Sequence, residues 1–214
     1  MNITWYGHSC FLLEAERAPR VLTDPCDPET GYLLHDVAAD IVTISHAHHD
    51  HDCVDAVGGS PTIVRLAGEH RYPGVKITGI PTWHDGVRGK ARGNNIVFVI
   101  EMDGLRLVHL GDLGHTLDAD TVAAIGTPDV LFTPIGGKYT IDAAAARQVF
   151  DALSPKLLIP MHYKTPALSF AIDGIEPFLQ VAGDLCIHRL NEASCTVDPD
   201  TLGEARVLVL NYQK

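Results

Sequence analysis

The octapeptide S-H-A-H-H-D-H-D, Ser45–Asp52, follows directly on the apolar run I-V-T-I. In an extended segment, residues two apart point to the same side, so His46 and His48 can be directed at one point. Asp50 and His51 follow a turn and can be directed at a neighbouring point. A solvated turn is the alternative, but packing several histidines and acids together costs free energy unless a cation organises them. Imidazole nitrogens and carboxylate oxygens are ligands that Zn²⁺, Fe²⁺ and Mn²⁺ accept, so this segment predicts a metal site.

The length and composition of the chain indicate a single domain spanning residues 1–214. Of the 214 residues, 46% are hydrophobic, which is enough for a sizeable core and argues against intrinsic disorder. Asp and Glu number 27 against 16 Lys and Arg, which gives a net charge of −11. Because nucleic-acid backbones attract basic surfaces, no nucleic-acid partner is expected.

Nothing in the sequence predicts export or membrane insertion. The opening M-N-I-T-W-Y-G-H-S-C lacks a basic segment, and no run reaches the roughly 18 apolar residues of a spanning helix. The five cysteines are scattered without a C-x-x-C pair, which argues against a disulfide framework and against a cysteine-based zinc site. A cytoplasmic location without a membrane partner is therefore expected.

Short apolar runs separated by Gly, Pro and Asp predict many strands. The expected strands are Ile3–Tyr6, Cys10–Leu13, Arg20–Thr23, Ile41–Ser45, Thr62–Leu66, Val75–Ile80, Ile96–Met102, Leu105–Leu110, Val130–Ile135, Leu157–Met161 and Ala205–Leu210. An apolar stripe from Ala146 to Leu153 predicts a helix with Thr140 as its N-cap, and Gly174–Ala182 predicts another helix. Strands with interspersed helices favour a layered α/β or α+β fold.

The H-x-H-x-D-H pattern after a strand resembles the metallo-β-lactamase superfamily, and further motifs of that family follow in order. These are Asp24 in L-T-D-P, His84 in P-T-W-H-D, Asp112 in H-L-G-D-L-G-H and His162 in I-P-M-H-Y. The opening I-T-W-Y-G-H-S-C-F, which contains His8, resembles the small stand-alone hydrolases related to ascorbate-6-phosphate lactonase. The segment F-T-P-I-G-G-K-Y-T resembles the same branch.

This resemblance implies a four-layer αββα sandwich that holds two divalent metal ions at one edge, between two sheets. It assigns the first ion to His46, His48 and His84, the second ion to Asp50, His51 and His162, and the bridge between the ions to Asp112. Each ion then has three protein ligands and a shared carboxylate, which leaves the open position that catalytic sites require. Zn²⁺ is the expected metal for a histidine-rich site, and Mn²⁺ and Fe²⁺ suit the same ligands.

Other polar residues near these motifs are candidates for supporting roles. Asp24 could accept the second N–H of a ligand histidine and fix its tautomer, or could simply form a turn. His8 is expected to take part in catalysis or to be a hydrogen-bonded turn residue, and His49 is expected to point outward. The candidate substrate-binding residues, each with an ordinary loop residue as the alternative, are Lys138, Tyr139 and His115.

The function implied by the resemblance is metal-dependent hydrolysis of an ester, lactone or phosphoester bond in a small anionic substrate. A hydroxide shared by the two ions would attack, and Asp50 would orient it. Asp112 stands where many zinc β-lactamases carry cysteine, which argues against a β-lactam substrate. The alternatives are a phosphodiesterase or ribonuclease acting on nucleotides, a di-iron redox protein and a metal-binding protein without turnover. Relatives of this branch are often oligomeric, so a homo-oligomer is left open.

Overall fold

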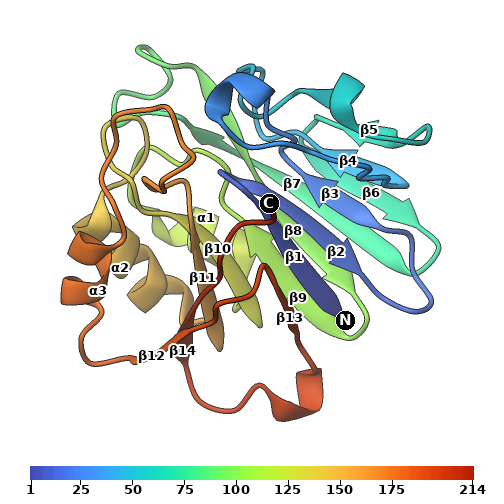
Figure 1. Cartoon of the computed structure of the whole chain (residues 1–214). Helices are drawn as coiled ribbons and strands as arrows, with labels where there is room; N and C mark the ends of the chain where they lie inside the picture. Colours follow the sequence, from blue (N-terminus) through green and yellow to red (C-terminus); the bar gives the residue numbers. More distant parts are fainter.

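The computed structural model describes residues 1–214, which form two β-sheets with helices outside them (Figure 1). The six-stranded sheet contains, in spatial order, β13 (Ser194–Thr196), β1 (Asn2–Gly7), β2 (Cys10–Glu14), β3 (Val21–Thr23), β4 (Ile41–Thr43) and β5 (Thr62–Val64). The eight-stranded sheet contains β12 (Cys186–Arg189), β14 (Arg206–Val209), β11 (Leu157–Met161), β10 (Val130–Pro134), β9 (Leu105–His109), β8 (Asn94–Met102), β7 (Val75–Trp83) and β6 (Gly68–Tyr72). This architecture confirms the expected mixed α/β class.

Aromatic side chains from both sheets pack against each other in the core. The rings of Phe11 from β2 and Phe132 from β10 lie 4.4 Å apart between centroids, and neither side chain is exposed to solvent. The indole of Trp5 from β1 lies 5.4 Å from the ring of Tyr163, which follows β11. Such large apolar surfaces, removed from water on both sides, hold the two sheets together.

The six-stranded sheet has an apolar cluster on each face, and successive side chains of its strands point to these two clusters in turn. Leu13 belongs to the core between the sheets, whereas its neighbour Leu12 belongs to a second apolar cluster on the opposite face. Tyr32 completes this second cluster, near the short 3-10 helices η1 (Pro28–Thr30) and η2 (Val54–Ala56). The outer layer on this side therefore consists of 3-10 turns and loops instead of α-helices.

Three α-helices lie beside β10 and β11, on the side away from β1 and β2 (Figure 1). They are α1 (Ala119–Ile125), α2 (Ala143–Leu153) and α3 (Glu176–Val181). The expected apolar stripe of α2 is confirmed, because the side chains at positions 146, 149, 150 and 153 are buried. None of the helices combines the length and the apolar character needed to cross a membrane.

The expected N-cap of α2 is wrong. The cap is Asp142, whose carboxylate accepts a hydrogen bond from the backbone N–H of Ala145 at 2.9 Å. Thr140 instead donates its hydroxyl to the carbonyl of Ile141, and the helix begins only at Ala143. Asp is as good an N-cap as Thr and lies at the first position from which its side chain can reach the helix.

Candidate metal centre

The residues of the metal motifs lie just beyond the ends of strands from both sheets. His46 follows β4 in the six-stranded sheet. In the eight-stranded sheet His84 follows β7, Asp112 follows β9 and His162 follows β11. The first turn between β1 and β2 adds His8. These ends meet at one edge of the sandwich, so stretches far apart in the sequence contribute to one cluster.

The potential ligands form two groups on either side of one carboxylate. Within each group the ligand atoms lie within 4.8 Å of one another; the first group is His46, His48 and His84, and the second is His8, Asp50, His51 and His162. The Oδ2 atom of Asp112 lies 3.3 Å from His84 Nε2 in the first group and 3.2 Å from His162 Nε2 in the second. Its Oδ1 atom lies 3.3 Å from His51 Nε2. One carboxylate, that of Asp112, therefore lies against both groups of potential ligands.

The hydrogen bonding within the cluster supports this interpretation independently. His46 Nε2, His51 Nε2 and Asp112 Oδ1 are buried and have no hydrogen-bond partner in the protein. A buried polar atom without a partner costs about 1–3 kcal/mol, and three such atoms converge here. Divalent cations would satisfy all of them, so the residues present fit a metal centre.

The electrostatics of the cluster also suit a cation. Burial lowers the pKa of His46 to about 3, so this imidazole is neutral at neutral pH. Burial opposes ionisation of Asp112, but His162 and His51 outweigh it and hold the pKa of this carboxyl well below its ordinary value. Burial likewise opposes the charged form of His51, but Asp112 and Asp24 raise the pKa of this imidazole well above its ordinary value. A metal ion bound here would take the place of the proton on His51.

Asp24 lies where it can hold His51 in the ligating tautomer. This carboxylate has no exposed surface, and its Oδ2 atom lies 2.9 Å from His51 Nδ1. Its Oδ1 atom accepts the backbone N–H of Ser45 at 2.8 Å, and Oδ2 also accepts the Ser45 hydroxyl. An ionised carboxylate can only accept, so Nδ1 of His51 donates and Nε2 keeps its lone pair for a metal.

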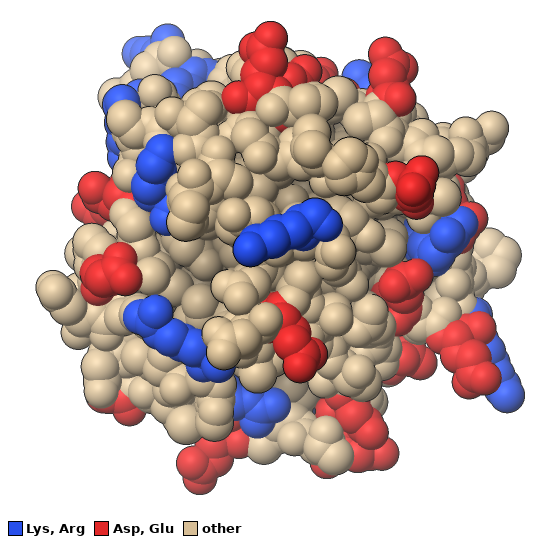
Figure 2. Space-filling model, in the orientation of Figure 1, with Lys and Arg blue, Asp and Glu red and all other residues tan.

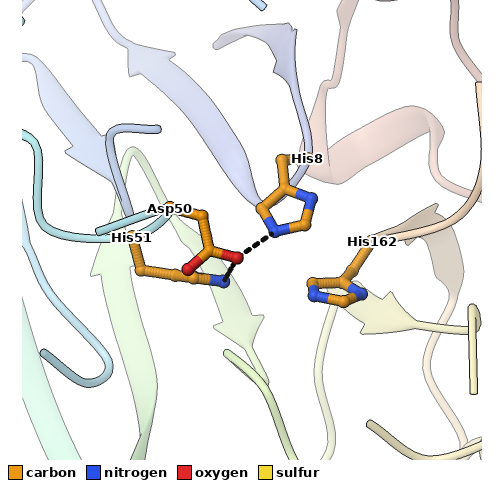
Figure 3. Close-up of side chains that lie close together, drawn as sticks. All are labelled: His8, Asp50, His51 and His162. Carbon is orange, nitrogen blue, oxygen red and sulfur yellow. Dashed lines mark hydrogen bonds and ion pairs between the residues drawn. The ribbon is translucent and has the colours of Figure 1, made fainter. Parts of the chain in front are cut away.

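His8 joins the second group of ligands and contacts Asp50. Its side chain is completely buried and points at Asp50 (Figure 3). The Nε2 atom of His8 lies 3.1 Å from Asp50 Oδ2. The backbone carbonyl of His8 accepts the N–H of His162 at 3.1 Å and the indole N–H of Trp5 at 3.1 Å. His8 and His162 both adopt positive φ angles, 51° and 48°, which is uncommon for residues with a side chain. His8 was expected near the site from its motif, and its contact with Asp50 was not predicted.

A second buried residue, Asn95, positions Asp112 and was missed by sequence analysis. The Asn95 side chain accepts the backbone N–H of Asp112 at 2.9 Å and donates to the carbonyl of Leu110 at 2.9 Å. Gly111, between these two residues, has φ of 55°, and a Cβ there would lie 2.4 Å from Asn95 Oδ1. The backbone at Gly111 therefore approaches Asn95 so closely that only glycine fits there.

A cavity of about 430 Å³ opens over the potential metal ligands. Besides the ligands, its lining includes His49, Arg92, Tyr139 and Phe170. His49 was expected to point outward, and it lies at this cavity with its side chain exposed. Tyr139 also belongs to this lining, and its expected contact with a substrate stays a prediction.

The other two candidate substrate residues lie outside this lining. The ammonium group of Lys138 donates to the carbonyl of Ala171 at 3.1 Å. His115 uses both ring nitrogens locally: Nδ1 donates to the carbonyl of Thr116 at 2.8 Å, and Nε2 accepts the backbone N–H of Trp83 at 3.3 Å. These contacts favour the loop-residue alternative for His115, and a substrate contact of Lys138 stays a prediction.

Comparison with known proteins places this architecture in a family. Residues 2–162 match the model of a β-lactamase superfamily domain. A UPF0173 metal-dependent hydrolase of Archaeoglobus fulgidus is 32% identical over 196 residues, which cover 77% of this chain and 84% of that protein. A protein of the same name from Thermoplasma acidophilum is 31% identical over 192 residues, with the same coverage.

The solved structures agree with the sequence relatives. A chain from Thermotoga maritima, named as a candidate Zn-dependent hydrolase of the metallo-β-lactamase superfamily, superposes with a TM-score of 0.83 at 39% identity. The match covers 99% of both chains. The protein therefore belongs to the metallo-β-lactamase superfamily and is related to the UPF0173 metal-dependent hydrolases.

Proposed function

We propose that this metal-dependent hydrolase cleaves an ester, lactone or phosphoester bond in a small anionic substrate at a dinuclear metal centre. The observation that carries the proposal is the pair of ligand groups on either side of Asp112, beneath a cavity. Arg92 and Tyr139 provide a cation and a hydroxyl donor in the cavity lining, which suits an anionic or oxygen-rich substrate.

The first ion would be held by His46, His48 and His84, and the second by Asp50, His51 and His162, with Asp112 shared. Two bound divalent ions supply Lewis acidity and lower the pKa of coordinated water towards about 7. Zn²⁺ is the metal we propose for this histidine-rich set, and Mn²⁺ or Fe²⁺ are the alternatives to be measured.

Asp50 would accept a hydrogen bond from the attacking water, and His8 would orient Asp50. Burial would raise the pKa of Asp50, but the hydrogen bond from His8 and the proximity of His51 outweigh burial and lower it. Asp50 is therefore ionised and able to accept a hydrogen bond from an attacking water. His8, whose pKa is lowered to about 4 mainly by burial, is neutral and orients Asp50 through Nε2.

The remaining parts of the proposal concern partners and location. On the face shown in Figure 2, some Lys and Arg residues gather at the upper left edge, the others lie among Asp and Glu, and no continuous basic patch extends across the face. Together with the net charge of −11, this supports a small-molecule substrate over a nucleic acid. All five cysteines are unpaired, which supports a cytoplasmic location.

The decisive experiment measures metal content and turnover on the same samples. Protein reconstituted separately with Zn²⁺, Mn²⁺ and Fe²⁺ is analysed by elemental analysis and assayed against ester, lactone and phosphodiester substrates. We expect two ions per chain and hydrolysis of one of these classes. His46→Ala and Asp112→Ala should lose metal and at least about 100-fold in turnover, whereas the exposed His188→Ala should retain both. Full loading and activity in His46→Ala would contradict the assignment, and dioxygen-dependent turnover of the iron form would favour a redox enzyme.

A further inference from the structure

A second cavity lies directly beside the one over the metal ligands. It has a volume of about 400 Å³, and His48 and Arg92 belong to the lining of both cavities. Its other charged residue is Arg65, and no carboxylate lines it. In a chain with 27 acidic and 16 basic residues, a cavity with two arginines and no acid is a local reversal of charge.

Arg92 is held in place by an unusually ordered loop. The buried carboxylate of Asp85, the residue after His84, accepts four backbone N–H groups at 2.8 Å each: those of Val87, Gly89, Ala91 and Arg92. The loop also closes on itself, because the N–H of Gly93 donates to the carbonyl of Gly89 at 3.0 Å. The metal ligand His84 and Arg92 are thus the two ends of one rigid loop.

The guanidinium of Arg92 is positioned without being neutralised. Its Nη2 atom donates to the carbonyl of Lys138 at 3.0 Å, and its Cζ atom lies 5.5 Å from the centre of the Tyr139 ring. Neither contact involves a carboxylate, and a guanidinium carries five N–H donors. The remaining donors stay available to a ligand.

Arg65 also lines the second cavity. It follows β5 directly, its side chain is exposed, and it forms no ion pair with any carboxylate of the chain, unlike Arg20, Arg71, Arg106 and Arg147. Two planar guanidinium groups in the lining of one cavity suit the oxygens of a carboxylate or a phosphate group.

We propose that Arg92 and Arg65 form an anion-binding subsite beside the metal centre, which selects substrates with a carboxylate or phosphate group away from the bond that is cleaved. This inference rests on the proposed function, because it places the cleaved bond over the metal ligands and the anionic group in the neighbouring cavity. Arg92 borders both cavities and therefore acts as the specificity residue between them.

The subsite is tested first by binding, which does not require turnover. Metal-loaded protein is titrated in a calorimeter with succinate, glutarate, adipate and pimelate, each compared with the monocarboxylate of the same chain length. The monocarboxylate measures the affinity of the metal centre alone, so the ratio of the two dissociation constants reports the second anion. At least one dicarboxylate should bind the wild type about tenfold more tightly than its monocarboxylate, as expected for one charge-assisted contact.

Variants test whether Arg92 and Arg65 cause the tighter binding of the dicarboxylate. Arg92→Gln and Arg65→Gln should each reduce the ratio about tenfold, and Arg92→Lys, which keeps the charge but not the planar fork, should restore part of it. Lys90→Gln is the matched control, since Lys90 is exposed on the same loop and lines neither cavity. Replacing glutarate by 4-phosphonobutyrate then shows which of the two anions the subsite prefers. An identical ratio in the wild type, both glutamine variants and Lys90→Gln would overturn the proposal.

A kinetic comparison separates this proposal from the function on which it rests. Mono-4-nitrophenyl glutarate and 4-nitrophenyl butyrate differ mainly in a terminal carboxylate. We expect a higher kcat/KM for the glutarate ester, about tenfold, and loss of that preference in Arg92→Gln. Binding that depends on Arg92 with no cleavage of either ester would refute ester hydrolysis and keep the subsite. Cleavage of both esters with the same preference in Arg92→Gln would refute the subsite and keep hydrolysis.

Discussion

Asp24→Asn should weaken the second metal site without changing any proposed ligand. In the wild type the ionised carboxylate accepts the Nδ1 proton of His51 at 2.9 Å, which leaves Nε2 free to bind a metal. In the wild type, Oδ1 of Asp24 accepts the backbone N–H of Ser45 at 2.8 Å. An asparagine that keeps its oxygen in this position turns its NH₂ group towards His51. His51 then accepts at Nδ1 and carries its proton on Nε2, where a metal must bind.

The magnitude of the effect follows from this change of tautomer. Loss of a residue that orients a metal ligand reduces metal affinity by about 10–100-fold, which corresponds to roughly 1.4–2.8 kcal/mol. The metal-free protein should also lose about 2 kcal/mol of unfolding free energy, because a fully buried ionic hydrogen bond is replaced by a neutral one. The first site, built from His46, His48 and His84, should keep its affinity.

The assay is a titration of metal-free protein with Zn²⁺ in the presence of a competing chelator. The wild type should show two binding events, and Asp24→Asn should weaken one of them. Asp129→Asn provides the control. Asp129 precedes β10, at the opposite end of the strands from the metal centre, where it accepts hydrogen bonds from Arg106 and Lys156 and contacts no metal ligand. If Asp24→Asn bound both ions as tightly as the wild type, the orienting role of Asp24 would be refuted.

Three further outcomes test the core, the site loop and the metal centre. Phe132→Ala removes a fully buried ring from between the sheets and should lower the unfolding free energy by about 3–5 kcal/mol in urea denaturation; a loss below 1 kcal/mol would contradict the packing described. Gly114→Ala should cost about 1–3 kcal/mol in the same assay, because its Cβ would lie 2.3 Å from the backbone nitrogen of Asp85, and an unchanged midpoint would count against this loop geometry. Removing metal with a chelator should lower the thermal midpoint, and Zn²⁺ at about 1,000 times its dissociation constant should restore roughly 4 kcal/mol; a midpoint insensitive to metal would speak against the site.

The sequence could predict part of the site because the candidate ligands follow the ends of recognisable strands. His84 and His162 each follow an apolar run directly, and in the structure each stands at the end of a strand of the same sheet. Period-two burial and strand direction are local properties, so they show in the sequence. The pairing of these ends with the six-stranded sheet is a long-range property, which only the family resemblance could supply.

Elements stabilised by their neighbours were missed for the same reason. The strand β6 has the sequence G-E-H-R-Y, without an apolar alternation, and exists because it pairs with β7 along its whole length. The strand β12 is mostly exposed and pairs in parallel with β14. The helix α1 spans only seven residues and buries Ile125 alone, which is too little for a periodic stripe. Their conformation is decided by tertiary pairing more than by their own sequence.

Arg92 shows a different limit of sequence analysis. The segment D-G-V-R-G-K-A-R-G contains three basic residues of equal appearance, Arg88, Lys90 and Arg92, and only the last lines the cavity. The choice among them depends on which backbone N–H groups Asp85 accepts, and that is fixed by loop geometry. Composition could identify a glycine-rich basic loop next to His84, but not the side chain that lines the cavity.

The position of the centre between two sheets links metal binding to the packing of the whole domain. His8, His46 and His51 come from the six-stranded sheet, whereas His84 and His162 come from the eight-stranded one. The hydrogen bond from the N–H of His162 to the carbonyl of His8 already joins the two sheets at this edge. Any change in their separation moves the two sets of ligands relative to each other. Metal affinity therefore reports on the inter-sheet core, and a bound metal in turn stabilises the arrangement of the sheets that binds it.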